Sequence, residues 1–203
     1  MKIALIGATG YVGSHLLKEL LLRGHDVTAV ARDTRTLQPQ ARLGVRQFDF
    51  NDADALKAAL AGADAVVIAV KFQASDPSRI LSAAAEAGVK RVLVIGGAGS
   101  LRTISGADLV DTPQMPEQWK PEARAAREFL EKLRAEQVLD WTFVSPSALL
   151  QNGERTGKFR IGGDALLVDE NGESRISLPD LAIAVADELE RSKHSRQRFT
   201  VGY

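Results

Sequence analysis

The sequence contains no cysteine. Disulfide bonds, thiolate nucleophiles and cysteine-ligated metal sites are therefore excluded. Histidine is also scarce, with three residues at His15, His25 and His194. No two of them stand at a spacing that suits a metal ion, so we expect no metal site.

An excess of either charge is absent too. The chain carries 26 basic and 26 acidic side chains, which gives a formal net charge of zero at pH 7. General nucleic-acid binders and membrane-surface binders need a basic excess, so we expect neither kind of partner. The expected partner is a small-molecule acceptor, and a local basic pocket for one phosphate stays compatible with the balance of charge.

Long apolar runs are missing as well. No stretch reaches the roughly 20 apolar residues that a membrane span needs. Glycines interrupt the apolar start of the chain, and no cleavage-type pattern follows it. We therefore interpret the start as the first strand of a cytoplasmic protein and not as a signal peptide.

Aromatic residues make up 5% of the chain and apolar residues 45%, so the core must consist mostly of Ala, Val, Leu and Ile. A length of 203 residues is typical of one domain. We expect a single domain over residues 1–203, with residues from about 146 to 203 as a smaller, substrate-side part. A homodimer and a monomer both remain open.

Apolar stretches of strand length alternate with stretches of helical periodicity. This alternation predicts right-handed βαβ units, and so an α/β fold of the Rossmann-like, three-layer αβα type with a mostly parallel sheet. Asp52 can cap one helix, and Gly24 and Gly88 can end two others. Strands are expected at Lys2–Ile6, Val27–Ala31, Val45–Phe48, Ala65–Val70, Arg91–Ile95 and Trp141–Val144, and helices at Tyr11–Leu22, Ala53–Leu60, Pro77–Ala87 and Pro121–Glu136.

The last quarter of the chain has a different character, because glycine and charged residues are frequent between 152 and 175. A short strand is expected near Ala165–Val168, a helix from Pro179 to Glu190 and a final strand at Arg198–Val201. Residues 99–120 form the longest stretch without clear periodicity, and loops of that length in a compact domain are often functional.

Three glycines spaced three apart stand between the first strand and the first helix, in the stretch GATGYVGSH. Such glycines allow a tight turn, a close approach of the backbone to a diphosphate, and close packing of helix and strand. The free N–H groups of the helix start then favour an anion. We predict a dinucleotide site here, with packing alone as the alternative. Its residues would be Gly7, Ala8, Thr9, Gly10, Tyr11, Val12 and Gly13.

The end of the second strand bears on which dinucleotide binds. NAD-binding proteins have an acidic residue there, whereas NADP-binding proteins have an arginine nearby. The expected acidic position is Ala31, and Arg32 follows it, so we favour NADP(H) over NAD(H). Asp33 is the counter-argument, and a solvated turn is the remaining alternative. After the third strand, Asp49 and Phe50 could hold the adenine, or the segment could simply lead into the next helix.

At this point the chain resembles a known family. The segments GATGYVGSHLL, GHDVTAVAR, VIGGAGSL and LDWTFVSPSAL are similar to those of the atypical short-chain dehydrogenase/reductases. The nearest branch holds NAD(P)H-binding proteins similar to flavin reductases and biliverdin reductase B, with NmrA-type proteins as neighbours. The resemblance implies a Rossmann fold, NADPH at the carboxyl ends of the strands, and hydride transfer to a flavin or a similar ring.

The chain departs from many relatives in one respect. They carry Tyr-x-x-x-Lys at the start of the long helix, where the lysine lowers the pKa of the tyrosine for proton transfer. The matching positions here are Lys120 and Arg124, and the two tyrosines of the chain, Tyr11 and Tyr203, lie elsewhere. Alcohol dehydrogenation by that route is therefore not expected. Hydride transfer to a flavin would need from the protein mainly the correct positioning of the two rings and favourable electrostatics.

Further site residues are expected beyond the carboxyl ends of the strands. Ser100, Trp119 and Lys120 are candidates for the catalytic region, with a turn cap, a surface anchor and a solvated helix start as their respective alternatives. Phe72 could line the pocket or fill core space, and Ser147 could line the pocket. Trp141 is expected in the core, and Asp164 and Asp169 are expected to be turn residues. The cofactor would also contact Ala69, Val70, Lys71, Gly96, Gly97, Ser145 and Pro146.

Three functions remain open. The first is an NADPH-dependent reductase that transfers hydride to a flavin or another conjugated acceptor. The second is an NADP-binding redox sensor without catalysis. A sugar epimerase or dehydratase is the least favoured, because the Tyr/Lys pair is missing.

Overall fold

The computed structural model of the chain describes residues 1–48 and 52–203. The chain divides into two compact units, which we call unit 1 and unit 2. Unit 1 comprises residues 1–94 and 137–141, and unit 2 comprises residues 95–136 and 142–203. The expected single domain with a smaller part from about residue 146 stays a prediction.

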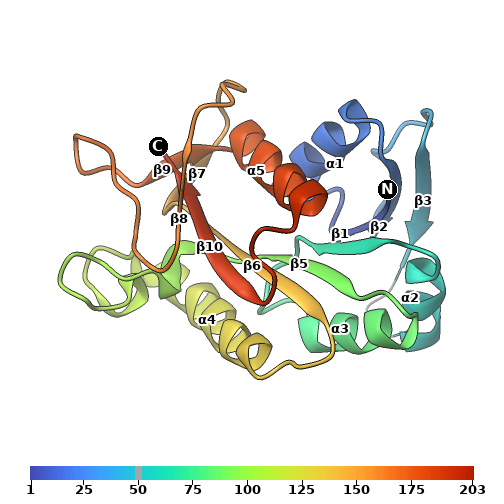
Figure 1. Cartoon of the computed structure of the whole chain (residues 1–203), viewed down its shortest axis with the longest axis horizontal. Coiled ribbons are helices and arrows are strands. Elements are labelled where there is room, and N and C mark those ends of the chain that lie inside the picture. The colour runs from blue at the N-terminus through green and yellow to red at the C-terminus, as the bar shows by residue number, and fades with distance from the viewer. Residues whose placement is uncertain (49–51) are drawn as a thin grey trace. The chain divides into compact units, whose positions relative to one another are not determined.

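Unit 1 is built on parallel strands in the order β3-β2-β1-β4-β5. Its helix α1 lies on one side of the strands, and α2 and α3 lie together on the other (Figure 1). The βαβ alternation thus gives the expected Rossmann-like α/β fold. The strands are β1 (Lys2–Ile6), β2 (Asp26–Ala31), β3 (Leu43–Gln47), β4 (Ala65–Ile68) and β5 (Arg91–Ile95), and the helices are α1 (Gly13–Leu22), α2 (Ala53–Leu60) and α3 (Pro77–Glu86).

Unit 2 contains β6 (Asp140–Pro146), which begins in unit 1 and pairs in parallel with β10 (Gln197–Gly202). The short strand β8 (Arg160–Gly162) runs antiparallel to β10, and β7 (Leu149–Gln151) pairs with β9 (Arg175–Ser177). Helices α4 (Lys120–Arg134) and α5 (Leu178–Arg191) lie on opposite sides of β10 (Figure 1).

The local signals of the sequence explain most element ends. The carboxylate of Asp52 accepts a hydrogen bond from the Ala55 N–H at 2.9 Å, as expected of a cap. Gly24 and Gly88 both have φ near 80° (79° and 78°), which only glycine adopts without strain at a helix end. The α/β fold class predicted from the alternation is confirmed.

Three expectations about elements were wrong. No strand forms at 165–168, where Ala165 makes only an isolated bridge to Arg102; the short strand of this region lies at 160–162 instead. The strand expected at Ala65–Val70 ends at Ile68, and Ala69 after it lies against Gly7. The first helix begins at Gly13 and not at Tyr11, since the glycine turn occupies the residues before it.

The long aperiodic stretch of unit 2 is organised by its own small core. Leu101, Leu109, Val110 and Met115 pack together with Ala98, and three short 3₁₀ turns, at Ala98–Ser100, Leu109–Asp111 and Glu117–Trp119, replace regular structure. The absence of periodicity in this stretch therefore reflects tight turns around buried side chains.

An ion-pair clamp holds the same stretch to helix α4. The guanidinium of Arg127 in α4 donates to Asp108 at 3.1 Å and to Asp111 at 2.5 Å. The stretch 99–120 therefore has defined partners without any ligand.

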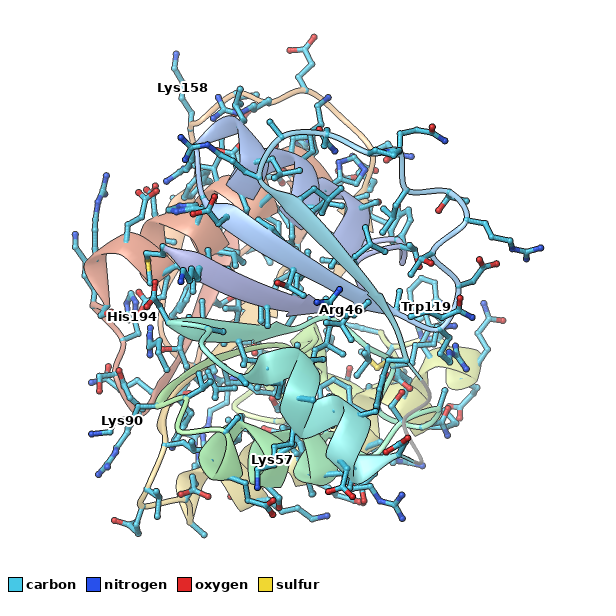
Figure 2. The ribbon with its side chains drawn as sticks, turned by 90° about the vertical axis from the view of Figure 1, so that its right-hand side faces the viewer. Arg46, Lys57, Lys90, Trp119, Lys158 and His194 are labelled. Atoms are coloured by element: carbon cyan, nitrogen blue, oxygen red, sulfur yellow. The ribbon has the colours of Figure 1, made fainter. Side chains whose placement is uncertain are left out.

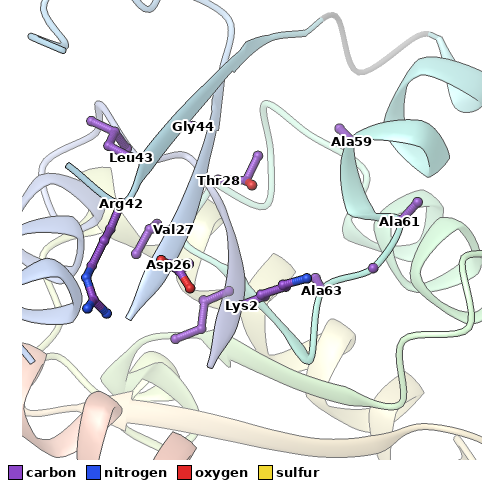
Figure 3. Close-up of a pocket in the computed structure, with 12 residues that line it drawn as sticks. Lys2, Asp26, Val27, Thr28, Arg42, Leu43, Gly44, Ala59, Ala61 and Ala63 are labelled. Carbon is purple, nitrogen blue, oxygen red and sulfur yellow. The ribbon is translucent and has the colours of Figure 1, made fainter. Parts of the chain in front are cut away.

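Among the helices of residues 1–48 and 52–203, none combines the length and the apolar character that crossing a membrane requires. A hollow of about 470 Å³ lies in unit 1 beside the amino ends of β1 and β2, where Lys2, Asp26 and Arg42 line it (Figure 3). The Lys2 backbone N–H donates to Asp64 at 2.7 Å, and Arg42 donates to the Gly24 carbonyl. Parallel α/β sheets bind ligands at the opposite, carboxyl ends, so we assign this hollow no part in the site.

Candidate functional site

The strand order of unit 1 marks one position for a ligand. β1 pairs with β2 on one side and with β4 on the other, so the order reverses at the carboxyl end of β1. Ligands of open α/β sheets bind at such a switch point. Gly7, the first glycine of the motif, directly follows β1.

The three glycines are needed for different contacts. Gly7 has φ 85°, and a Cβ on it would overlap the carbonyl oxygen of Ala69 after β4. A Cβ on Gly13 would overlap the Gly7 carbonyl oxygen, so helix and strand pack here through backbone alone. Gly10 is exposed, and a Cβ on it would lie 3.2 Å from the Gly7 oxygen. The turn therefore presents bare backbone to solvent, which is the cradle a diphosphate requires.

Helix α1 begins without a side-chain cap. Helices α2 and α3 begin with the side-chain caps of Asp52 and Asp76. At the start of α1, within the described residues, Val12 makes no side-chain cap and the first turn holds no acidic side chain. The N–H groups of Ser14 and His15 already donate to the carbonyls of Gly10 and Val12, so what the helix start offers an external anion is the positive end of its dipole.

The end of β2 places a small cluster of charges at the expected ribose position. β2 ends at Ala31, and the exposed Arg32 follows at once. Asp33, the acidic alternative, is already engaged by Arg35, whose Nε lies 3.0 Å and Nη2 2.6 Å from its carboxylate oxygens. Hydrogen bonds from the Arg35 guanidinium and from its backbone N–H lower the pKa of Asp33 to about 2.

The remaining candidates of unit 1 differ in exposure. Ala69 and Val70 are half-buried after β4, and Lys71 is exposed. Phe72 is half-buried, which leaves both pocket and core roles open. The candidates Asp49 and Phe50 lie outside the described residues.

In unit 2 the two glycines after β5 have distinct surroundings. A Cβ on Gly96 would overlap the ring of Phe143, so this glycine is explained by packing against β6. A Cβ on Gly97 would meet nothing within 4 Å. Of these two glycines, only Gly97 therefore leaves open space at its Cα. A nicotinamide ring could approach the backbone closely there.

A buried arginine brings two candidate serines together. The Arg198 side chain, 4% exposed, donates through Nη1 to the Oγ atoms of Ser100 and Ser145, each at a long 3.4 Å. Its Nε donates to Asp164 at 2.7 Å. The hydrogen bond from Arg198 lowers the pKa of Asp164; desolvation opposes this, and the charges of Arg198, Arg134 and Arg102 add to it.

Arg198 was missed from the sequence because an arginine at the start of a terminal strand carries no local signal. Asp164, expected to be a turn residue, is its main partner. Asp169 does behave as a turn residue, since it accepts from the N–H groups of Asn171 and Glu173. Pro146 and Ser147 are buried, and the Ser147 hydroxyl donates to the Val201 carbonyl at 3.1 Å. These two residues therefore connect β6 to β10.

The start of α4 holds Trp119 and Lys120. The Trp119 side chain is 50% exposed and stands at the surface (Figure 2), whereas Trp141 is buried as expected. The Lys120 ammonium pairs with Glu117, and this hydrogen bond lowers the pKa of Glu117. Tyr203 donates its hydroxyl proton to Asp180 at 2.8 Å, and Tyr11 is exposed next to the glycine turn.

Unit 2 contains a pocket of about 840 Å³ bounded by the stretch 103–119. Met115 and Trp119 line it from this stretch, and Ala148, Leu166 and Val168 line it from the segments after β6 and β8. Its volume lies within the range of small-molecule sites. The aperiodic stretch predicted to be functional thus forms a wall of a ligand-sized pocket.

Comparison with known proteins agrees with this geometry. The sequence profile of a family described as NAD(P)H-binding matches residues 7–191. The uncharacterized protein YwnB of Bacillus subtilis (strain 168) is 38% identical, over 99% of this chain and 98% of its own.

Two solved structures cover all of this chain. A protein of Bacteroides thetaiotaomicron described as a candidate epimerase is 42% identical with a TM-score of 0.95, over 96% of its own chain. A protein of Streptococcus pneumoniae TIGR4 described as a candidate NADH-flavin reductase is 34% identical with a TM-score of 0.86, over 99% of its own chain. The glycine turn, the Rossmann-like fold and these matches lead to one conclusion: the chain belongs to the NAD(P)H-binding family.

Proposed function

We propose that this protein is an NADPH-dependent reductase that transfers hydride to a flavin or another conjugated acceptor, without a Tyr/Lys pair. When bound, NADPH supplies the hydride, two electrons and one proton, and leaves as NADP⁺, while solvent supplies the second proton that completes the dihydro-acceptor. The chain's own task is then to bind NADPH and the acceptor and to orient the nicotinamide ring against the acceptor ring.

The observation that carries the proposal is the pocket of unit 2. A protein that only senses the cofactor needs no site for a second molecule, whereas a reductase does. The pocket exists in the chain without ligand, and its wall 103–119 is held by the Arg127 clamp and by the small core around Leu109. The relative from Streptococcus pneumoniae, a candidate NADH-flavin reductase, supports the same reaction class.

The cofactor preference rests on Arg32. A guanidinium suits a 2′-phosphate, and the competing carboxylate of Asp33 is occupied by Arg35. Arg35, which was not a sequence candidate, neutralises that carboxylate. We therefore propose NADP(H) over NAD(H).

The test is NADPH oxidation followed at 340 nm with FMN, riboflavin and a naphthoquinone as acceptors. Loss of absorbance above the enzyme-free blank is expected with at least one acceptor. The matched control is Gly10→Asp, which places a carboxylate at the diphosphate cradle and should abolish both NADPH binding and oxidation. Its melting temperature is measured alongside to show that it folds, because a Cβ at this position lies 3.2 Å from the Gly7 oxygen. Binding of NADPH without oxidation of any acceptor would contradict the reductase.

A redox sensor is the second candidate, and the missing Tyr/Lys pair favours it equally. A sensor of the NADPH/NADP⁺ ratio must bind the two forms with different affinities, which calorimetry measures directly. Equal affinities together with turnover would exclude it. The candidate epimerase from Bacteroides thetaiotaomicron raises a third function, but with Lys120 at the position of the family's tyrosine we do not favour it.

A further inference from the structure

The pocket of unit 2 has an unusual lining for a site that would hold a phosphorylated molecule. All its lining residues belong to the described part of the chain, and none of them is charged. Leu109, Met115, Leu166 and Val168 supply apolar walls, and Ile104 stands fully exposed at the rim. A large apolar side chain held in solvent beside a concave apolar surface is typical of a ligand contact.

The polar groups of the lining are neutral and mostly engaged. The Thr103 hydroxyl lies 2.9 Å from that of Ser105, and the Thr112 hydroxyl donates to the Leu109 carbonyl at 2.8 Å. Gln114 is exposed, and its side chain has no hydrogen-bond partner among residues 1–48 and 52–203. The pocket therefore offers an amide to a ligand, but no charge.

Two of the cations next to the pocket in the chain are already paired, and the third, the exposed Arg102 beside Thr103, does not line the pocket. Lys120, beside Trp119, is bound to Glu117. Arg175, beside the lining residue Ser174, lies 3.1 Å from Asp169 and 3.5 Å from Glu173. A phosphate within this pocket would lose its hydration without meeting a charge in the lining, which is costly.

Trp119 adds a planar surface. Its side chain is half-exposed and borders the pocket, so part of the indole is accessible to a ring-bearing ligand. Offset stacking of aromatic rings adds stabilisation beyond the area that it buries.

We propose that this pocket binds the uncharged, ring-bearing form of the acceptor, that is, riboflavin or a simple quinone, and discriminates against FMN and FAD. The inference rests on the proposed function and narrows its substrate class. Selectivity comes from the missing counter-charge, because the isoalloxazine ring is the same in riboflavin and FMN.

Riboflavin and FMN form the matched pair for the test, since they differ only in the phosphate. With saturating NADPH, kcat/KM for riboflavin should exceed that for FMN by about tenfold or more, because the phosphate would be desolvated without a partner. Equal or faster reduction of FMN would overturn this inference and leave the reductase intact. No oxidation with either flavin or with quinone would contradict the proposed function itself.

A charge placed in the lining makes the test sharper. Gln114→Lys should raise kcat/KM for FMN by about tenfold, since a cation then meets the phosphate, and leave riboflavin within about twofold. Gln118→Lys is the control, because Gln118 is exposed in the same segment but does not line the pocket. An equal gain in both variants would overturn the inference, because it would show long-range steering of the anion.

Binding can be measured without turnover. Riboflavin titrated into the protein without cofactor should quench the fluorescence of the exposed Trp119, and Trp119→Phe should remove that part of the signal, since Trp141 is buried. Quenching that is unchanged in Trp119→Phe would overturn the assignment of the pocket. A stable dimer that binds riboflavin only after dissociation would do the same, because the pocket would then be an interface between copies.

Discussion

The buried guanidinium of Arg198 donates to the carboxylate of Asp164, 34 residues earlier in the chain, at 2.7 Å through Nε. With that end of the side chain held, its Nη1 stands between the hydroxyls of Ser100 and Ser145. A hydroxyl that accepts from a cation must direct its own proton elsewhere. The pair Arg198–Asp164 therefore orients two serines that the sequence places in the candidate site.

Loss of Arg198 should slow the reaction more than it destabilises the protein. Arg198→Met is expected to lower kcat by about tenfold and to change KM little. A loss of this size is near the lower end for hydrogen bonds from a charged group, because the contacts are long. Arg198→Lys should recover part of kcat, since lysine keeps the positive charge but lacks the planar guanidinium that donates several hydrogen bonds at once. Steady-state kinetics and the pH profile of kcat measure the effect.

Arg134→Met is the control for that experiment. Arg134 also faces Asp164, but at 3.9 Å, and it does not reach the serines. A wild-type kcat for Arg198→Met, or an equal loss in Arg134→Met, would contradict a positioning role for Arg198.

The two glycines after β5 should respond differently to alanine. Gly96→Ala would drive a methyl group into the Phe143 ring and should lower the free energy of unfolding by about 1–3 kcal/mol. Gly97→Ala meets open space and should fold normally, but weaken cofactor binding if a ring approaches the backbone there. Urea unfolding and calorimetry separate the two effects. Unchanged NADPH affinity in Gly97→Ala would remove Gly97 from the site.

Arg32 should control the choice of cofactor. Arg32→Ala is expected to weaken NADPH binding by about ten- to a hundredfold through the loss of a charge-assisted contact, and to leave NADH nearly unchanged. Arg35→Ala should also lower the preference for NADPH, because it frees the Asp33 carboxylate for a ribose hydroxyl. Calorimetric titration of both cofactors tests both variants, and an equal loss for NADPH and NADH in Arg32→Ala would refute the assignment.

Asp180 should make the stability of unit 2 depend on pH. Burial alone would raise its pKa, but hydrogen bonds from the Thr156 hydroxyl, the Gly157 N–H, the Tyr203 hydroxyl and the Thr156 N–H together lower it. A carboxyl whose pKa is lower in the folded state contributes stability above its unfolded pKa, about 3.9, and loses it as pH falls through the folded pKa.

The variant Asp180→Asn should therefore unfold more easily than the wild type at neutral pH, by about 1–3 kcal/mol, because it leaves buried donors without an acceptor. The difference in the free energy of unfolding should shrink below about pH 4. Tyr203→Phe, which removes one of the donors, should give a smaller loss. A difference that stays constant from pH 7 to about pH 3 would show that the charge of Asp180 does not contribute.

Local patterns in the chain account for the elements that they predicted. The Gly7–Gly13 turn, the Asp52 cap and the glycines after α1 and α3 act within a few residues, so their effect is readable from spacing. The strand expected near Ala165–Val168 failed for the opposite reason. Leu166 and Val168 of this segment line a pocket, while the short strand at Arg160–Gly162 exists because β10 supplies a partner for its backbone.

The sequence by itself determined the α/β fold, the glycine turn at the carboxyl end of β1 and, through the absence of cysteine, the exclusion of disulfide and thiolate chemistry. Only the tertiary structure decided that Arg198 meets Ser100 and Asp164, and that segments far apart enclose a pocket without charge in its lining. The physical reason is the distance along the chain over which each effect acts. Helix, strand and turn preferences act between neighbours, whereas the partner of a buried charge is set by long-range packing that spacing does not encode.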